Sequence, residues 1–232
     1  MCKDVIIACD FSSKEELFAF LDKLGDYKPY LKVGMELYYK EGAPMVRELK
    51  ERGYKIFLDL KLHDIPNTVY KAMRNLGALG VDITNVHAAG GIKMMAAALK
   101  GLREGAGEGA MPKLIAVTQL TSTDADTLKN ELLINETLEN TVRKYALNAK
   151  EAGLDGVVCS PLEASLIKEL GLMSVTPGIR LAGDSVDDQK RVSTPALARE
   201  MGSTYIVVGR SITGAQNPQE AYAECVRQFK GE

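Results

Sequence analysis

The feature that most constrains the fold of this chain is a regular alternation of short apolar runs with amphipathic stretches. In each amphipathic stretch the apolar residues recur at helical spacing, whereas the short runs are typical of buried strands. This alternation predicts parallel strands joined by right-handed helical crossovers. The predicted strands lie at 5–9, 30–34, the first part of 55–68, 82–87, 113–120, 156–160, 174–176 and 205–208.

Eight strand–helix units in 232 residues fit a closed barrel. No change in composition marks a boundary, so residues 1–232 are expected to form one α/β domain, a TIM (β/α)8 barrel. The alternative is a doubly wound open sheet. That fold would favour a glycine-rich turn after the first strand, whereas the chain there reads Asp10-Phe11-Ser12.

Helix boundaries are predicted from capping residues and from glycine and proline. Ser12 and Ser13 each precede a glutamate by three residues, which is the spacing of a capping box. A helix over 36–52 is expected to break near Gly42 and Pro44. The remaining predictions include a helix over 67–79 with Asn67 as its N-cap, and a two-part helical region over about 125–152.

Composition and charge narrow the classes of function. Charged residues make up 26% and hydrophobic residues 46% of the chain, as in an ordinary globular protein. The net charge of −2 argues against a nucleic-acid-binding surface, and no apolar run approaches the roughly 18 residues that span a bilayer. The start of the chain lacks the layout of a signal peptide. We therefore expect a cytoplasmic protein without nucleic-acid or membrane partners.

The cysteines offer no metal-binding or redox motif. They are widely separated in the sequence, so no CxxC spacing exists. Cys9 and Cys159 lie in apolar runs and are expected in the core. Scattered cysteines fit a reducing compartment. The full set is Cys2, Cys9, Cys159 and Cys225.

The stretch 55–68 carries the densest chemistry. It begins as a buried strand and then places Asp59, Lys61 and Asp64 where that strand should end. Side chains alternate along a strand, so Asp59 and Lys61 point the same way, while Asp64 lies beyond the strand end. Pro66 prevents the strand from continuing. On this spacing alone, a surface salt-bridge cluster and a functional array are equally compatible with the sequence.

Most other predicted strands also end in a polar residue that follows apolar ones. In (β/α)8 barrels the carboxyl ends of the strands meet at one mouth, where active sites are built. These side chains are therefore expected to converge there. The positions are Asp10, Lys32, Asp59, Lys61, His87, Thr121, Arg180 and Arg210.

The ends of the seventh and eighth predicted strands indicate a phosphate site. Arg180 and Arg210 each lie near a glycine, Gly178 and Gly209. Barrels frequently bind phosphate at these two loops, because glycine lets the backbone approach the anion and arginine offers a planar fork of donors. Either arginine alone could be a solvated loop charge, but the pair favours phosphate.

The charges of the second and third strands suggest an unusual reaction. Lys32, Asp59, Lys61 and Asp64 sum to zero and can be buried as a neutral array. We expect the two aspartates to keep Lys61 protonated, which makes it a poor Schiff-base nucleophile and a suitable proton donor. Lys32 should also discourage a divalent cation from binding Asp59 and Asp64, because it already supplies the positive charge. Such an array suits the loss of a neutral molecule from an anion, with Asp59 facing the departing carboxylate and Lys61 protonating the carbanion.

The same stretch, Asp59-x-Lys61-x-x-Asp64-Ile65-Pro66-Asn67-Thr68, resembles the signature of the orotidine 5'-monophosphate decarboxylase family. The resemblance spans nearly the whole chain and departs at Cys9, where a bulkier apolar residue is usual. It implies a cofactor-free TIM barrel that acts as a homodimer with shared active sites and makes UMP in pyrimidine synthesis. The further matching segments are Asp10, 32–34, 119–122, 177–180, Gln189 and 208–212.

The resemblance also implies roles for individual residues. Lys61 is the proton donor in a charged array with Lys32, Asp59 and Asp64, of which Asp64 comes from the other subunit. The substrate would be orotidine 5'-monophosphate. Independently, the 181–190 loop is polar and adjoins Arg180, so we predict that it closes over bound nucleotide. The implied contacts are Asp10 and Lys32 with the ribose, Thr68 with the sugar across the dimer, Thr121 and Ser122 with the pyrimidine, and Arg180, Gln189, Gly209 and Arg210 with the phosphate.

Two alternatives differ in kind. One is a magnesium-dependent sugar-phosphate decarboxylase or aldolase of the same superfamily, which shares Asp-x-Lys-x-x-Asp but carries an acidic residue where this chain has Lys32. The other is a non-catalytic barrel that binds a nucleotide or phosphate. Such a binder would not need opposed buried charges beside its phosphate site.

Overall fold

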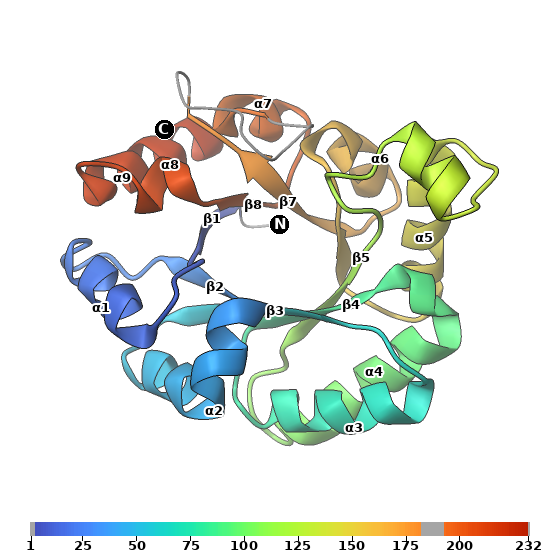
Figure 1. Cartoon of the computed structure of the whole chain (residues 1–232), viewed down its shortest axis with the longest axis horizontal. Helices are drawn as coiled ribbons and strands as arrows, with labels where there is room; N and C mark the ends of the chain where they lie inside the picture. Colours follow the sequence, from blue (N-terminus) through green and yellow to red (C-terminus); the bar gives the residue numbers. More distant parts are fainter. Residues whose placement is uncertain (1–2, 182–192, 232) are drawn as a thin grey trace.

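The computed structural model describes residues 3–181 and 193–231, and its strands form a closed parallel barrel in the order β1 to β8 (Figure 1). Closure of the barrel confirms the predicted fold and rules out the open sheet. The strands are β1 (Asp4–Ala8), β2 (Tyr30–Gly34), β3 (Lys55–Leu62), β4 (Ile83–His87), β5 (Lys113–Val117), β6 (Gly156–Val158), β7 (Met173–Ile179) and β8 (Tyr205–Val208).

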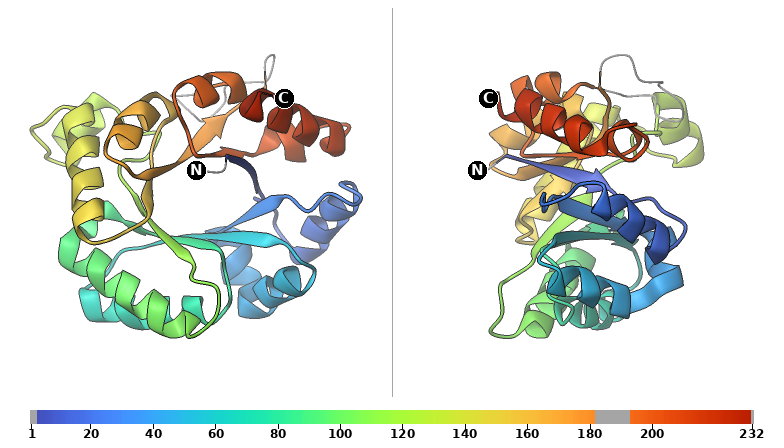
Figure 2. Two further views of the ribbon diagram at one scale, coloured as in Figure 1. Left: turned by 180° about the vertical axis from the view of Figure 1, so that it is seen from behind. Right: turned by 90° about the vertical axis from the view of Figure 1, so that its left-hand side faces the viewer.

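The helices surround the barrel on its outside, as the views from behind and from the side also show (Figure 2). This arrangement follows from the alternating sequence, because each crossover helix must pack back onto the sheet. The α-helices are α1 (Lys14–Asp22), α2 (Met35–Glu51), α3 (Pro66–Gly77), α4 (Gly91–Ala106), α5 (Leu138–Glu151), α6 (Ala164–Glu169), α7 (Pro195–Glu200), α8 (Arg210–Thr213) and α9 (Pro218–Lys230). No helix in the described ranges is long and apolar enough to cross a membrane.

Two of the helix predictions are confirmed. Ser13 is the N-cap of α1, and its side chain accepts a hydrogen bond from the backbone of Glu16. The helix over α2 is interrupted at Gly42, whose φ of 68° lies in the left-handed region. Glycine enters that region at little cost, so the break occurs where the sequence allows it.

Two others have different outcomes. The prediction that Asn67 caps α3 is wrong, because the helix already begins at Pro66 and its N-cap is Ile65. Proline suits the first helical position, where its missing N–H would have no helical partner in any case. The prediction of a two-part helical region over about 125–152 is confirmed: one part is a π-helical turn, Thr127–Glu131, and the other is α5, which starts at Leu138 with Thr137 as its cap.

The core has two parts separated by the strands. A large cluster fills the space between barrel and helices, and Cys9, Cys159 and Cys225 are buried in it, as expected for Cys9 and Cys159. A smaller cluster fills the barrel itself. It consists of Ile6, Ala8, Tyr30, Phe57, Ile83, Ile115, Met173, Val175 and Val207.

The inward-facing side chains become polar towards the carboxyl ends of the strands. On β2 the apolar Tyr30 is followed by Lys32, and on β3 Phe57 is followed by Asp59. Because side chains on one face recur every second residue, these polar groups lie directly above the smaller apolar cluster. That cluster therefore forms the floor of a site at the barrel mouth.

Candidate active site

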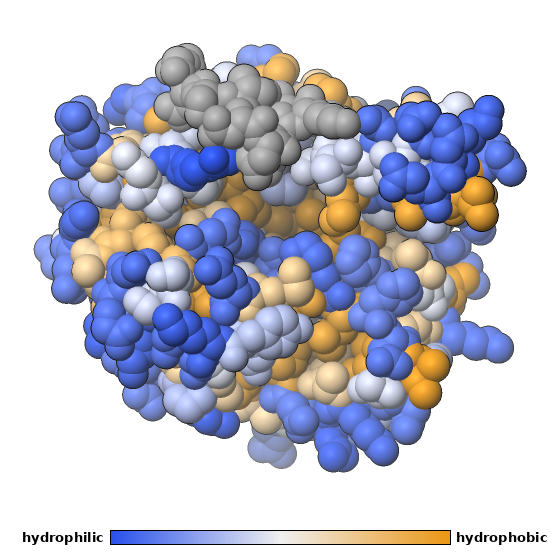
Figure 3. Space-filling model, in the orientation of Figure 1, coloured by the Kyte–Doolittle hydropathy of each residue, from blue (hydrophilic) through white to orange (hydrophobic). Residues whose placement is uncertain are grey.

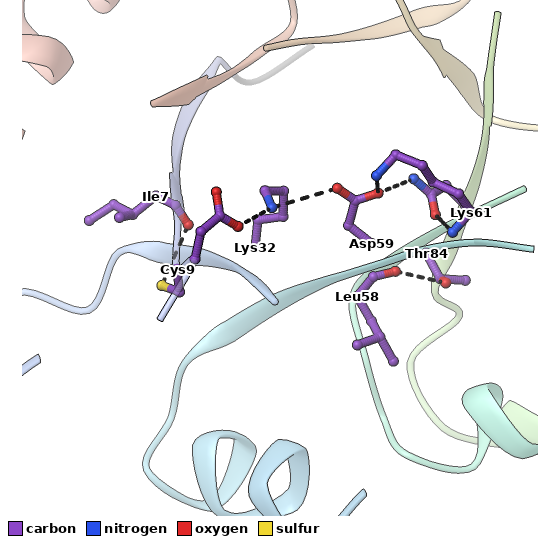
Figure 4. A network of polar contacts seen from close by, with 9 residues as sticks. Ile7, Cys9, Lys32, Leu58, Asp59, Lys61 and Thr84 are labelled. Atoms are coloured by element: carbon purple, nitrogen blue, oxygen red, sulfur yellow. Dashed lines mark hydrogen bonds and ion pairs between the residues drawn. The ribbon is translucent and has the colours of Figure 1, made fainter. Parts of the chain in front are cut away.

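Four charged side chains form a continuous chain across the barrel mouth. Lys32 Nζ lies 2.9 Å from Asp10 Oδ1 and 3.6 Å from Asp59 Oδ2, and Lys61 Nζ lies 2.7 Å from Asp59 Oδ1. Figure 4 shows Lys32, Asp59 and Lys61 in a row, with Asp59 between the two lysines. The predicted common orientation of Asp59 and Lys61 is confirmed. We call these four residues, Asp10, Lys32, Asp59 and Lys61, the charge chain.

The structure changes one part of the predicted charge pattern. The lysine that lies between two carboxylates of this chain is Lys32, whereas Lys61 is paired with Asp59. Asp64 is exposed beyond the end of β3, and its Oδ1 accepts a hydrogen bond from the backbone N–H of Ile65 at 2.6 Å. Within one chain, neutrality is therefore reached with Asp10 in place of Asp64.

Burial and pairing act against each other in the charge chain. Burial alone lowers the pKa of Lys32, but the carboxylates of Asp59 and Asp10 outweigh it, and the pKa stands above its ordinary value. Burial raises the pKa of Asp59, yet Lys32 and Lys61 together bring it below its ordinary value. Both groups are therefore held in their charged forms although Asp59 is only 7% exposed.

Two histidines border the charge chain. The ring of His87, on β4, lies 5.7 Å from that of His63 between centroids. Burial lowers the pKa of His87, and the nearby His63 and Lys61 lower it further. His87 is therefore held neutral at physiological pH and adds no charge to the array.

The charge chain opens into a cavity of about 290 Å³ with an apolar wall. Figure 3 shows a hollow in this face, with hydrophobic residues towards its floor and hydrophilic residues around it. Thr121 and Ser122 lie at its edge, as predicted, next to Gln119. Its apolar lining is Phe57, Val117, Leu120, Val158, Cys159, Val175, Pro177 and Val207.

A second cavity of about 360 Å³ adjoins the first and shares Lys32, Pro177 and Val207 with it. Arg180, Gly209 and Arg210 line it, which brings the predicted phosphate residues of β7 and β8 together. Asp10, Gly178 and Thr213 complete its polar wall. We call this second cavity the arginine cavity.

Gly178 and Arg180 show how the end of β7 is built. Gly178 has a φ of 81°, and the pairing of β7 with β8 shifts register between Thr176 and Ile179. The left-handed conformation at Gly178 therefore coincides with an irregularity that turns the strand end. The guanidinium of Arg180 then donates to the carbonyl oxygen of Ile179 at 3.0 Å, which fixes it at the cavity edge.

Three predicted site residues lie apart from these cavities or outside the described residues. Asp64 and Thr68 are exposed, and neither is among the described residues that line the two cavities. Gln189 and the rest of the segment 182–192 lie outside the described residues, so the predicted closure of the 181–190 loop is not tested.

One site residue was missed entirely. Asn85, on β4, is fully buried and donates from its side-chain amide to Asp59 Oδ1 at 2.7 Å. Its amide oxygen accepts from the backbone N–H of Lys61 at 2.8 Å. The only sequence signal was a polar residue in the middle of an apolar strand, Ile83-Thr84-Asn85-Val86.

The fold and these two joined cavities define the class of protein: a (β/α)8-barrel enzyme with paired lysines and aspartates at the ends of β2 and β3. The chain belongs to the orotidine 5'-phosphate decarboxylase / HUMPS family, whose model matches residues 3–225. The resemblance drawn from the stretch 55–68 is thereby confirmed.

The relatives support the same assignment over the full length. The chain is 57% identical over 235 residues to the orotidine 5'-phosphate decarboxylase of Bacillus cytotoxicus, covering 100% of this chain and 99% of that protein. It is similar to the crystal structure of orotidine 5'-phosphate decarboxylase from Lactobacillus acidophilus, with a TM-score of 0.89 and 45% identity over 98% of this chain and 99% of that one. The Pyrococcus horikoshii enzyme gives a TM-score of 0.77 at 25% identity, covering 98% of this chain and 100% of that one.

Proposed function

We propose that the chain, acting as one catalytic domain over residues 1–232, converts orotidine 5'-monophosphate to UMP and CO2 in pyrimidine nucleotide synthesis. The observation that carries this proposal is the row Lys32–Asp59–Lys61, buried beside an apolar cavity that joins an arginine-lined one. A planar pyrimidine fits the apolar cavity, and a phosphate fits the arginine cavity. The ribose would then lie between them, near Lys32 and Asp10.

The charge chain supplies the chemistry in this proposal. Loss of CO2 leaves an electron pair on C6 of the pyrimidine, and that carbanion must be stabilised and protonated. Lys61 carries a positive charge fixed by Asp59 at 2.7 Å, so it can stabilise the carbanion without reorganising and then give it a proton. Asp59 would face the departing carboxylate and Lys32 would hold Asp59 ionised.

The binding contacts follow from the same placement. Thr121 and Ser122 lie at the edge of the apolar cavity and would hydrogen-bond the pyrimidine. Arg180, Gly209 and Arg210 would hold the phosphate in the arginine cavity. Gln189 is proposed to join them from the loop that follows Arg180.

We propose that the reaction needs no metal or organic cofactor. Lys32 Nζ already lies between the carboxylates of Asp10 and Asp59, where it provides the positive charge that a divalent cation would bring. This distinguishes the proposal from the alternative of a magnesium-dependent sugar-phosphate enzyme.

The test is the loss of orotidylate absorbance with purified protein after exhaustive chelation. The proposal expects full turnover in chelator and no increase on adding magnesium. Activity restored only by magnesium, or with a sugar phosphate in place of orotidylate, would assign the chain to the alternative. A barrel that only binds nucleotide would bind UMP and leave orotidylate unchanged.

We further propose that the enzyme is a homodimer in which Asp64 and Thr68 of one chain complete the site of the other. Both are exposed beyond the end of β3, and Asp64 is not paired with Lys61 of its own chain. Between them lies Ile65, an apolar side chain that is 67% exposed, and Tyr39 of α2 is 71% exposed. An exposed apolar side chain between two exposed residues of the proposed site suits a self-complementary contact.

The proposed setting is the cytoplasm, with a small-molecule nucleotide as partner and no nucleic acid or membrane. The net charge of −2 supports this, since nucleic-acid and anionic membrane surfaces attract basic proteins.

A further inference from the structure

The pairing of β3 with β4 is interrupted between Leu58 and Leu62, the segment that contains Asp59 and Lys61. Leu58 lies opposite Thr84 and Leu62 opposite Val86, so β3 advances four residues while β4 advances two. Lys61 lies in this bulge with a φ of 52°, in the left-handed region that side chains other than glycine seldom adopt. A lysine in this conformation needs interactions that compensate for it.

Asn85 occupies the place on β4 that the bulge leaves open. Its Oδ1 accepts the backbone N–H of Lys61 at 2.8 Å, so a side-chain oxygen replaces the missing strand carbonyl. Its Nδ2 donates at 2.7 Å to Asp59 Oδ1, the same oxygen that Lys61 Nζ contacts. Because a backbone N–H can only donate, the orientation of the amide is determined.

We propose that Asn85 is a positioning residue for the decarboxylation, which fixes both the backbone of Lys61 and the carboxylate that pairs with its ammonium group. The inference rests on the proposed function of Lys61. Asn85 and Lys61 both contact Asp59 Oδ1, which leaves Oδ2 to pair with Lys32 at 3.6 Å. Asn85 thus helps to determine which carboxylate oxygen pairs with Lys61 and which with Lys32.

No other common side chain of this size meets both demands. The position needs one acceptor for a backbone N–H and one donor for a carboxylate, on a side chain short enough to stay within the strand pair. Aspartate is isosteric but lacks the donor when ionised, and it would place a second negative charge against Asp59. Leucine has the volume without either group.

The test compares Asn85→Leu and Asn85→Asp with Thr84→Val as the control. Thr84 is also fully buried on β4 and donates to the carbonyl of Leu58 at 3.0 Å, but it faces away from the charge chain. The kcat of Asn85→Leu for orotidylate should fall about 100-fold, as expected for a misplaced reacting group, while KM changes little. Thr84→Val should keep the wild-type kcat, although the loss of its buried hydrogen bond should lower its melting temperature.

The pH profile of Asn85→Asp separates positioning from a general loss of packing. The new carboxyl group would face Asp59 and Lys61 on β3, with Lys32 on β2 and His87 on its own strand nearby. When protonated it can donate to Asp59 Oδ1, and when ionised it cannot. The ratio of its kcat to that of the wild type should therefore rise as the pH falls.

Three results would overturn the inference: a kcat of Asn85→Leu within threefold of wild type, an equal loss in Thr84→Val, or a ratio for Asn85→Asp independent of pH. An inactive wild-type protein would instead reject the proposed function. In that case crystal structures of the two variants would test the inference. The φ of Lys61 should become negative in Asn85→Leu and stay positive in Thr84→Val.

Discussion

The two ends of the candidate site differ in the charged groups that line them. At the β2–β3 end, Lys32 and Lys61 are already paired with carboxylates of the same chain at 2.7 to 3.6 Å. At the β7–β8 end, Arg180 and Arg210 line a cavity without a carboxylate other than Asp10 among its described lining residues. Lysines that lie next to carboxylates contribute little to attracting substrate, whereas the described lining of the arginine cavity carries a net positive charge, which attracts an anion.

This difference suggests that the two ends have separate roles in binding and catalysis. The β2–β3 end is buried and held by ion pairs, so it suits interactions that gain strength only as charge develops in the transition state. The arginine cavity suits ground-state binding of a phosphate, whose charge does not change during the reaction. Substitutions at the two ends are therefore expected to affect different kinetic constants.

The largest effect is expected from Lys61→Ala. Removing the proposed proton donor should lower kcat for orotidylate by about 10⁴-fold, the upper end for a positioned general acid. In this variant Asp59 would also lose one of its two lysine partners. Steady-state absorbance assays measure the change, with Lys129→Ala on the π-helical turn as a control that should behave as wild type. A Lys61→Ala enzyme with near-normal kcat would end the assignment of the proton donor.

A smaller effect is expected from Arg210→Ala. Loss of a charge-assisted contact to phosphate should raise KM about 100-fold, corresponding to about 2.7 kcal/mol. Arg143→Ala is the matched control, because Arg143 is partly exposed on α5 and paired with Glu139, and it lines neither cavity. If KM stayed constant while kcat fell, Arg210 would act in catalysis, like the charge chain, and not in phosphate binding.

Mixing variant chains tests whether the β2–β3 end of the site is completed by the other subunit. A mixture of Lys61→Ala and Asp64→Ala chains should recover roughly a quarter of wild-type activity, because half of the randomly formed dimers hold one intact site of two. Lys61→Ala mixed with Arg210→Ala should gain nothing above the residual activity of Arg210→Ala, since both groups belong to the same chain's site. Equal outcomes for the two mixtures, with hybrid dimers verified by native mass spectrometry, would contradict sharing.

A further effect concerns stability. The pKa of Asp59 is lower in the folded protein than its ordinary value, so its stabilising contribution is complete above about pH 3.9 and is lost as the pH falls through the folded value. At pH 7, Asp59→Asn should reduce the free energy of unfolding by about 3 kcal/mol, because two lysines lose their buried partner. Urea titrations should show this difference shrinking below about pH 3.9.

A matched control for the stability effect is Asp22→Asn, at the exposed end of α1. It should leave the unfolding free energy nearly unchanged at every pH. A difference between wild type and Asp59→Asn that stayed constant from pH 7 to pH 3 would show that packing, not charge pairing, causes the loss.

Much of this site could be predicted from sequence because strand geometry is periodic. Alternation alone placed Asp59 and Lys61 on one face, and the structure joins them at 2.7 Å. The position of Arg180 and Arg210 after the last two strands was enough to bring both to one cavity, since parallel strands of a closed barrel end at the same mouth.

The parts that could not be predicted depend on contacts between strands. Asn85 reads as one polar residue in a strand, and its importance appears only when the bulge opposite it is known. The pairing of Lys32 with both Asp10 and Asp59 likewise depends on the register of β1, β2 and β3. Asn67 was mistaken for a cap because a good capping residue outweighed the proline before it, which begins the helix.

The division between the two ends can be tested most directly by the affinity for UMP, which contains the phosphate but has no carboxylate to lose. Isothermal titration of UMP into Lys61→Ala and Arg210→Ala separates ground-state binding from catalysis in one experiment. We expect Lys61→Ala to bind UMP nearly as tightly as the wild type and Arg210→Ala to bind it about 100-fold more weakly. Loss of UMP binding in Lys61→Ala with normal binding in Arg210→Ala would contradict the account.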